Sequence, residues 1–196
     1  MNKSLVTAIA FSLLAAPVFA QQPPAAPAQT NAAAQAQAAL QRSCANQPCQ
    51  RNVPVTIRDL KGATYTKTFD LLPPAVQNDG VLVMAGQRVY FEGALANGRV
   101  AALRHVNAIT QPARTMSATL SQLPDGRMQY VLTNPFAQPI KFEVGVTVLG
   151  SNRTVRTASC PILPGKSGTI IWDQPVLMAI AAGGVAITQQ SQMNCS

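Results

Sequence analysis

Short stretches of apolar and β-branched residues, separated by turn residues, dominate the chain from Val53 onward. The clearest stretch runs from Ile140 to Val148, where every second residue is apolar. This alternation places the apolar side chains on one face of a half-buried strand. Turn sequences such as Asn97-Gly98 and Pro124-Asp125-Gly126 separate the stretches, and they favour antiparallel connections.

The strands predicted in chain order cover residues 53–58, 63–69, 81–84, 88–92, 99–106, 114–121, 127–133, 140–149, 154–159 and 169–172. The last apolar stretch, residues 176–187, is interpreted as a strand, a bent strand pair or a short helix. Gly183-Gly184 within it is interpreted as a turn or a bulge. Many short strands with regular turns are typical of an all-β sandwich. We therefore expect residues 43–196 to form a single antiparallel Ig-like β-sandwich.

The first twenty residues have the pattern of a cleavable secretory signal peptide. Lys3 supplies a positive charge, residues 5–16 are mainly apolar, and Val18-Phe19-Ala20 ends the segment with small residues at the −3 and −1 positions. The apolar stretch is shorter than the roughly 20 residues that span a bilayer. We predict cleavage between Ala20 and Gln21 and a periplasmic or secreted protein that does not span the membrane.

Residues 21–42 differ in composition from the rest of the chain. The stretch 21–30 is rich in Pro, Ala and Gln, which is typical of an extended, flexible linker. Asn31 is a good helix N-cap, and the Ala, Gln and Leu residues from Ala32 to Arg42 are good helix formers. We therefore predict a linker with one short helix.

The charge balance is basic, although only 11% of the residues are charged. After the predicted signal peptide, fourteen Lys and Arg residues stand against seven acidic residues, which gives a formal charge of +7. Arg99, Arg104 and Arg114 lie close in sequence and form a candidate surface for an anionic lipid headgroup or glycan. The alternative is an ordinary solvated basic surface. The aromatic residues are too few and the charges too dispersed for a nucleic-acid module.

Four cysteines, Cys44, Cys49, Cys160 and Cys195, are an even number in a chain predicted to be exported. This favours two disulfides, for which three pairings are possible. We predict Cys44–Cys49, which closes a short loop, and Cys160–Cys195, which fastens the C-terminal segment to a strand end. The spacing lacks the short-range pairs typical of a zinc site or a redox-active pair.

Few residues can support catalysis. His105 is the single histidine, and it lies beside Arg104 in a predicted strand. A serine nucleophile elbow is missing, and the acidic residues are scattered, with Asp79 and Asp125 in predicted turns. The single tryptophan, Trp172, ends a strand and is interpreted as a core residue, with a binding anchor as the alternative. We predict no catalytic residue, metal or cofactor.

These observations lead to three hypotheses. The first is an exported, non-catalytic β-sandwich that binds another component of the cell envelope, either a protein or an anionic lipid or glycan. The second is a subunit or a chaperone-like accessory factor of a surface assembly, in which a neighbour's strand completes an edge of the sandwich. The third is a small hydrolase or ligand-binding enzyme that uses Arg104, His105 and an unplaced carboxylate.

Overall fold

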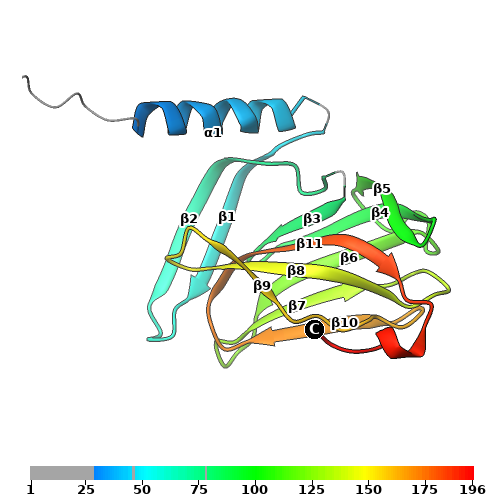
Figure 1. Cartoon of the computed structure of the whole chain (residues 1–196). Coiled ribbons are helices and arrows are strands. Elements are labelled where there is room, and N and C mark those ends of the chain that lie inside the picture. The colour runs from blue at the N-terminus through cyan, green and yellow to red at the C-terminus, as the bar shows by residue number, and fades with distance from the viewer. Residues whose placement is uncertain (1–28, 46, 78) are drawn as a thin grey trace, which may run out of the picture.

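The computed structural model describes residues 29–45, 47–77 and 79–196 (Figure 1). The predicted signal peptide, residues 1–20, and residues 21–28 of the predicted linker lie outside the described residues. Helix α1 (Gln29–Ser43) contains the predicted helical stretch. It begins before Asn31, so the prediction that Asn31 caps the helix is wrong. The side chains described in α1 are exposed, except that Leu40 is half-buried.

Every predicted strand occurs, because alternation and turn residues are local properties of the sequence. The bounds are β1 (Gln50–Arg58), β2 (Thr64–Leu72), β3 (Gly80–Met84), β4 (Arg88–Ala96), β5 (Arg99–Val106), β6 (Thr115–Gln122), β7 (Met128–Thr133), β8 (Ile140–Val148), β9 (Thr154–Thr157), β10 (Ser167–Trp172) and β11 (Val176–Ala186). Strand β11 is one bent strand, with a register shift between Ala182 and Val185. A short 3₁₀ helix, η1 (Gln190–Gln192), follows it.

Strands β1 and β2 form a separate two-stranded ribbon that lies against the rest of the molecule. The side chains of Val53, Val55 and Ile57 on β1 are buried in the common core. Side-chain amides fasten both ends of β1. Gln87 Nε2 donates to Gln50 Oε1 at 3.0 Å, and the backbone N–H of Arg58 donates to Gln122 Oε1 at 2.9 Å.

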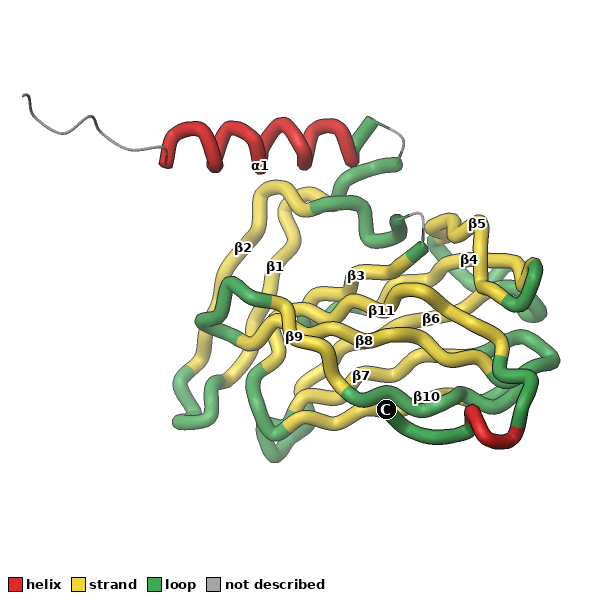
Figure 2. The backbone as a smooth tube through the Cα atoms, in the orientation of Figure 1, coloured by secondary structure: helices red, strands yellow, loops and turns green. Residues whose placement is uncertain are grey.

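The other strands form one curled antiparallel sheet in the order β10-β7-β6-β4-β5-β11-β8-β9, with β3 also paired to β11 (Figure 2). Strand β5 meets β11 at a single residue pair, Arg99 with Val185, so the path turns a corner there. The predicted all-β, antiparallel class is confirmed. An Ig-like arrangement is not confirmed, because the hydrogen-bonded path is continuous instead of forming two separate sheets.

The curled sheet encloses the apolar core. The largest fully buried side chains include Phe91, Met116, Leu120 and Tyr130. A bulge shapes the sheet where β4 and β5 pair, because the register shifts between Glu92 and Ala94. On the facing strand, Ala102 has a φ of 53°, which is the left-handed region that suits glycine.

Both predicted disulfides are present. Cys44–Cys49 closes the loop between α1 and β1, with a Cα–Cα distance of 5.1 Å. Cys160–Cys195 joins the segment after β9 to the C-terminal segment, with a Cα–Cα distance of 4.1 Å. Such bonds persist in oxidising compartments outside the cytoplasm. No helix in the described part of the chain is long and apolar enough to cross a membrane.

Candidate functional site

The two end strands of the curled sheet, β9 and β10, lie next to each other without forming a ladder. Strand β9 pairs with β8 and β10 pairs with β7, so each of them has one unpaired edge. The two edges are linked by a side-chain hydrogen bond, in which Trp172 Nε1 donates to Thr157 Oγ1 at 3.1 Å. We call this junction between β9 and β10 the seam. Unpaired edges present free N–H and C=O groups, which can pair with another strand.

One end of the seam opens into a groove of about 350 Å³. Its apolar lining comes from β8, β9, β10 and β11, and consists of Val146, Val148, Val155, Ile171, Trp172 and Val176. Arg156, Thr157, Asp173 and Gln174 supply the polar part. The groove is therefore an apolar depression with a mixed-charge rim.

The groove is lined partly by a side chain from the core-facing side of the sheet, that of Val155. Val155 is the register partner of Val146, so both side chains lie on the same face of the sheet. Val146 is 4% exposed, whereas Val155 is 53% exposed. The core-facing side of β9 is thus left uncovered at the seam. On β10, Ile171 is also 44% exposed, although it projects from the opposite face to Trp172.

The chain leaves β9 soon after Thr157 because the next residues are held elsewhere. Ser159 exchanges two backbone hydrogen bonds with Ser196, each at 3.0 Å, and its hydroxyl donates to the Phe142 carbonyl at 2.6 Å. Cys160 is then tied to Cys195. These contacts keep β9 short and fix the position of the loop that leads to β10.

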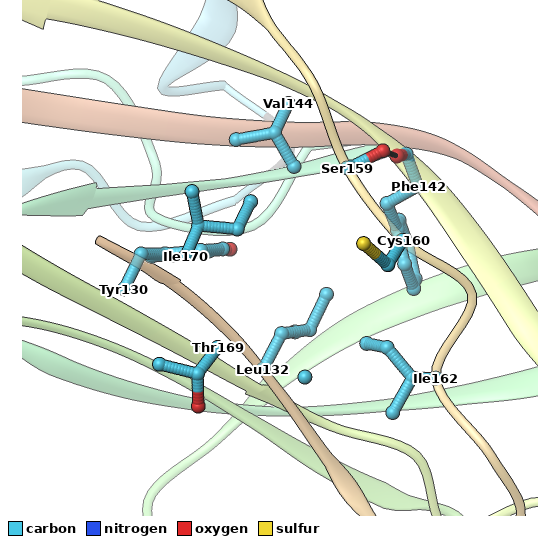
Figure 3. Close-up of a pocket in the computed structure, with 10 residues that line it drawn as sticks. Tyr130, Leu132, Phe142, Val144, Ser159, Cys160, Ile162, Thr169 and Ile170 are labelled. Atoms are coloured by element: carbon cyan, nitrogen blue, oxygen red, sulfur yellow. Dashed lines mark hydrogen bonds between the residues drawn. The ribbon is translucent and has the colours of Figure 1, made fainter. Parts of the chain in front are cut away.

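A small cavity lies beyond the seam, between β10 and the segment that follows β9 (Figure 3). It has a volume of about 30 Å³. The residues that line it are Tyr130, Leu132, Phe142, Val144, Ser159, Cys160, Ile162, Gly168, Thr169 and Ile170. Gly168 permits this packing, because a Cβ there would lie 2.7 Å from Ile162 Cγ1.

The Tyr130 hydroxyl points into this cavity (Figure 3) and has no hydrogen-bond partner among the described residues. Tyr130 is 1% exposed, and its ring centroid lies 6.3 Å from that of Trp172. Burial raises the pKa of the Tyr130 hydroxyl far above its usual range, so this group stays protonated. It is a neutral, unsatisfied hydrogen-bonding group within an apolar wall.

The three arginines of the predicted anionic-partner surface do not all meet. Arg104 Nη2 lies 2.6 Å from Glu92 Oε2, and the charge of Arg114 also acts on Glu92. Arg99 lies five residues before Arg104 on β5, roughly 17 Å away along a strand. The structure thus gathers Arg104 and Arg114 around one carboxylate, which offsets part of their charge.

Glu92 is a buried acid whose side chain is 1% exposed. Removal from water raises its pKa, but hydrogen bonds from Thr110 and Arg104 and the charges of Arg104 and Arg114 outweigh that effect. The net result is a pKa below the usual range, so the carboxylate is ionised at neutral pH. Sequence reasoning did not single out Glu92, because nothing local distinguishes it from the other scattered acids.

His105 does not join Arg104 and Glu92. Arg104 and His105 are consecutive on β5, so their side chains leave opposite faces of the strand, and Glu92 is the register partner of Arg104. His105 is exposed and lines a different groove, of about 280 Å³, beside Gln50 and Arg88. Within the residues that the structure describes, no cluster of His, Cys, Asp or Glu could hold a metal ion.

Comparison with known proteins identifies no relative. No protein-family model matches the chain, and no curated protein or solved structure matches it. The features of the molecule that bear on its function are the seam, its groove and the Tyr130 cavity.

Proposed function

We propose that this is an exported, non-catalytic protein that binds an extended segment of another envelope protein along the seam. The observation that carries this proposal is Val155, a core-facing residue of an edge strand that is 53% exposed. It lines the groove and belongs to β9, one of the two end strands that have a free edge. A segment in the seam would cover Val155 and pair with the free backbone groups of β9 or β10.

The chemistry of such a site is strand addition. Main-chain hydrogen bonds to an exposed edge supply affinity for any extended peptide, and pockets for alternate side chains supply selectivity. An apolar side chain that enters the groove would contact Val155 and Trp172. Full burial of a valine side chain contributes about 1.5–3 kcal/mol, and Val155 retains about half of this gain for a partner.

The direction of the bound segment also follows from the sheet. Each of the seven strand pairings along the path from β10 to β9 is antiparallel, so β9 and β10 run antiparallel to each other. A strand between them is necessarily antiparallel to one and parallel to the other. Antiparallel pairing is slightly more stable per residue, and β10 is longer than β9. We therefore propose that the segment runs antiparallel to β10.

Export is part of this proposal. It is supported by the signal-like pattern of residues 1–20, with cleavage between Ala20 and Gln21, and by the two disulfides. We further propose that the curled sheet is an Ig-like sandwich whose two layers are joined at the corner between β5 and β11. The partner then lies in the periplasm or at the cell surface.

The test is site-specific photo-crosslinking in intact cells. A photoreactive side chain at Ile171, at the seam, is compared with one at Ile109, which is similarly exposed at 56% but belongs to the loop between β5 and β6. We expect a discrete protein adduct from position 171 and none from position 109. The same adduct should be lost when Val155→Lys is added, since a charge on the groove wall opposes an apolar side chain.

Each other result has a definite meaning. An adduct between two copies of this chain supports the hypothesis of an assembly subunit. Adducts confined to position 109, near Arg104 and Arg114, support the anionic-partner surface and overturn the seam proposal. An adduct from position 171 that is unchanged by Val155→Lys overturns it as well.

A further inference from the structure

We infer that the cavity beside Tyr130 is a selectivity subsite of the seam, and that it takes a short, uncharged, hydrogen-bonding side chain of the bound segment. Serine, threonine and asparagine are the side chains of this class. The inference rests on the proposed function, because it concerns the occupant of the same seam. The apolar groove alone does not supply a preference for such a polar side chain.

The orphan hydroxyl of Tyr130 is the first observation. Buried polar groups in proteins almost always have a hydrogen-bond partner, and an unsatisfied one is costly. No described residue supplies a partner. The Ser159 hydroxyl donates to the Phe142 carbonyl, Thr169 lies at an exposed position of β10, and most of the other residues that line the cavity are apolar. Because Tyr130 remains protonated, its hydroxyl can donate to an incoming oxygen or accept from an incoming O–H or N–H.

The size and polarity of the cavity limit what it accepts. A volume of about 30 Å³ is room for about two water molecules, so an aromatic or long aliphatic side chain does not fit. A charged side chain is disfavoured as well, because no charged residue lines the cavity to supply a counter-charge. A hydroxyl or small amide group meets both limits.

The groove and the cavity both lie along β10, so one bound segment can reach both of them. Trp172 and Thr157, which share the hydrogen bond, line the groove, whereas the cavity is lined by the preceding residues of β10, Gly168 to Ile170. Trp172, Ile170 and Gly168 alternate along the core-facing side of β10. Side chains on one face of a strand repeat every second residue, about 6.6–6.8 Å apart. An apolar residue in the groove and a short polar residue in the cavity therefore occupy the same face of one extended segment.

A displayed library of random twelve-residue peptides tests this inference directly. The library is selected in parallel on the wild-type protein, on Tyr130→Phe and on Val155→Lys, each checked for native folding by circular dichroism. We expect the wild type to enrich peptides with an apolar residue and a Ser, Thr or Asn on the same strand face. Tyr130→Phe should enrich peptides with the same apolar residue but without the polar preference, and Val155→Lys should enrich neither.

Affinities of one selected peptide complete the test. Replacement of its Ser, Thr or Asn by Ala should weaken binding to the wild type about five- to tenfold, the effect of one buried hydrogen bond, and leave binding to Tyr130→Phe unchanged. Peptides that require Val155 but show equal preferences on the wild type and Tyr130→Phe overturn the subsite and leave the seam intact. Failure to enrich any peptide that depends on Val155 overturns the proposed function itself.

Discussion

The indole N–H of Trp172 donates to the hydroxyl of Thr157 at 3.1 Å, and within the described residues this is the only hydrogen bond that joins β9 to β10. Trp172 is also the single tryptophan of the chain. The two end strands of the sheet thus meet at a residue whose fluorescence reports on their contact. The bond must break or shift if another strand enters the seam.

Removal of the acceptor should loosen the seam. In Thr157→Val the indole N–H loses its partner, so we expect acrylamide to quench Trp172 more strongly and the free energy of unfolding to fall by about 1 kcal/mol. Thr68→Val is the matched control, because Thr68 is exposed on β2, which pairs only with β1 within the described residues. Equal quenching in the wild type and Thr157→Val would show that the bond does not hold the seam.

Tyr130 should make the protein sensitive to alkali. Its hydroxyl has a raised pKa in the folded state, so the unfolded chain loses this proton first as pH increases. Stability is therefore full below the unfolded pKa of about 10, and it falls above that by about 1.4 kcal/mol per pH unit for this one proton. Tyr130→Phe should abolish this loss of stability above about pH 10. It should also raise the free energy of unfolding at pH 7 by about 1 kcal/mol, since the unsatisfied hydroxyl is gone.

Urea unfolding of both proteins from neutral to alkaline pH provides the measurement. Parallel stability curves for the wild type and Tyr130→Phe would mean that the hydroxyl is hydrogen-bonded or hydrated in solution. A stabilised variant that has lost peptide selectivity would instead show that the cavity is kept for binding at a cost in stability.

Glu92 should contribute stability that acid removes. The pKa of Glu92 in the folded state lies below its ordinary value, so the contribution is present above the unfolded pKa and is lost as pH falls through the lower folded pKa. Glu92→Gln should lower the urea midpoint at pH 7, and the difference from wild type should shrink in acid. Glu143→Gln is the control, because its pair with Arg156 is exposed on both sides and should contribute little. A pH-independent difference for Glu92→Gln would contradict this account.

The bulge at Ala102 stores backbone strain. A left-handed conformation costs an L-residue about 1–2 kcal/mol and costs glycine little. We expect Ala102→Gly to raise the free energy of unfolding by up to about 1 kcal/mol, measured by urea titration. Ala101→Gly, one residue away on β5, should lower it, since glycine weakens ordinary strand positions. If Ala102→Gly and Ala101→Gly both lower the free energy of unfolding, the backbone at Ala102 is not strained.

Local signals in the sequence were sufficient to predict the strands. Alternation from Ile140 to Val148 and turns such as Asn97-Gly98 depend on neighbouring residues, and the structure has a strand or turn at each of these places. The disulfides were also predictable, since they follow from the number of cysteines, the compartment and two loops that can be closed. By contrast, the separate pairing of β1 with β2 was not evident from the sequence.

The candidate site depends on long-range pairing, and for this reason it could not be predicted. Val146 and Val155 look alike in sequence, yet one is buried and the other is exposed, because none of the strands in the described part of the chain covers β9 on its free side. Tyr130 looks like any core aromatic until its hydroxyl is seen to lack a partner. The proximity of Arg99, Arg104 and Arg114 in sequence suggested a cluster, but the length of β5 separates Arg99 from the others.

The seam is complete only after the Cys160–Cys195 bond has formed. Strands β10 and β11 both lie between these two cysteines, so both must be made and delivered before the bond can close. Until then, the loop that leads from β9 to β10 lacks its tether. In a reducing cytoplasm the thiols remain free. On the proposed function, newly made chains would therefore carry an unfinished seam and could capture a partner only after oxidation.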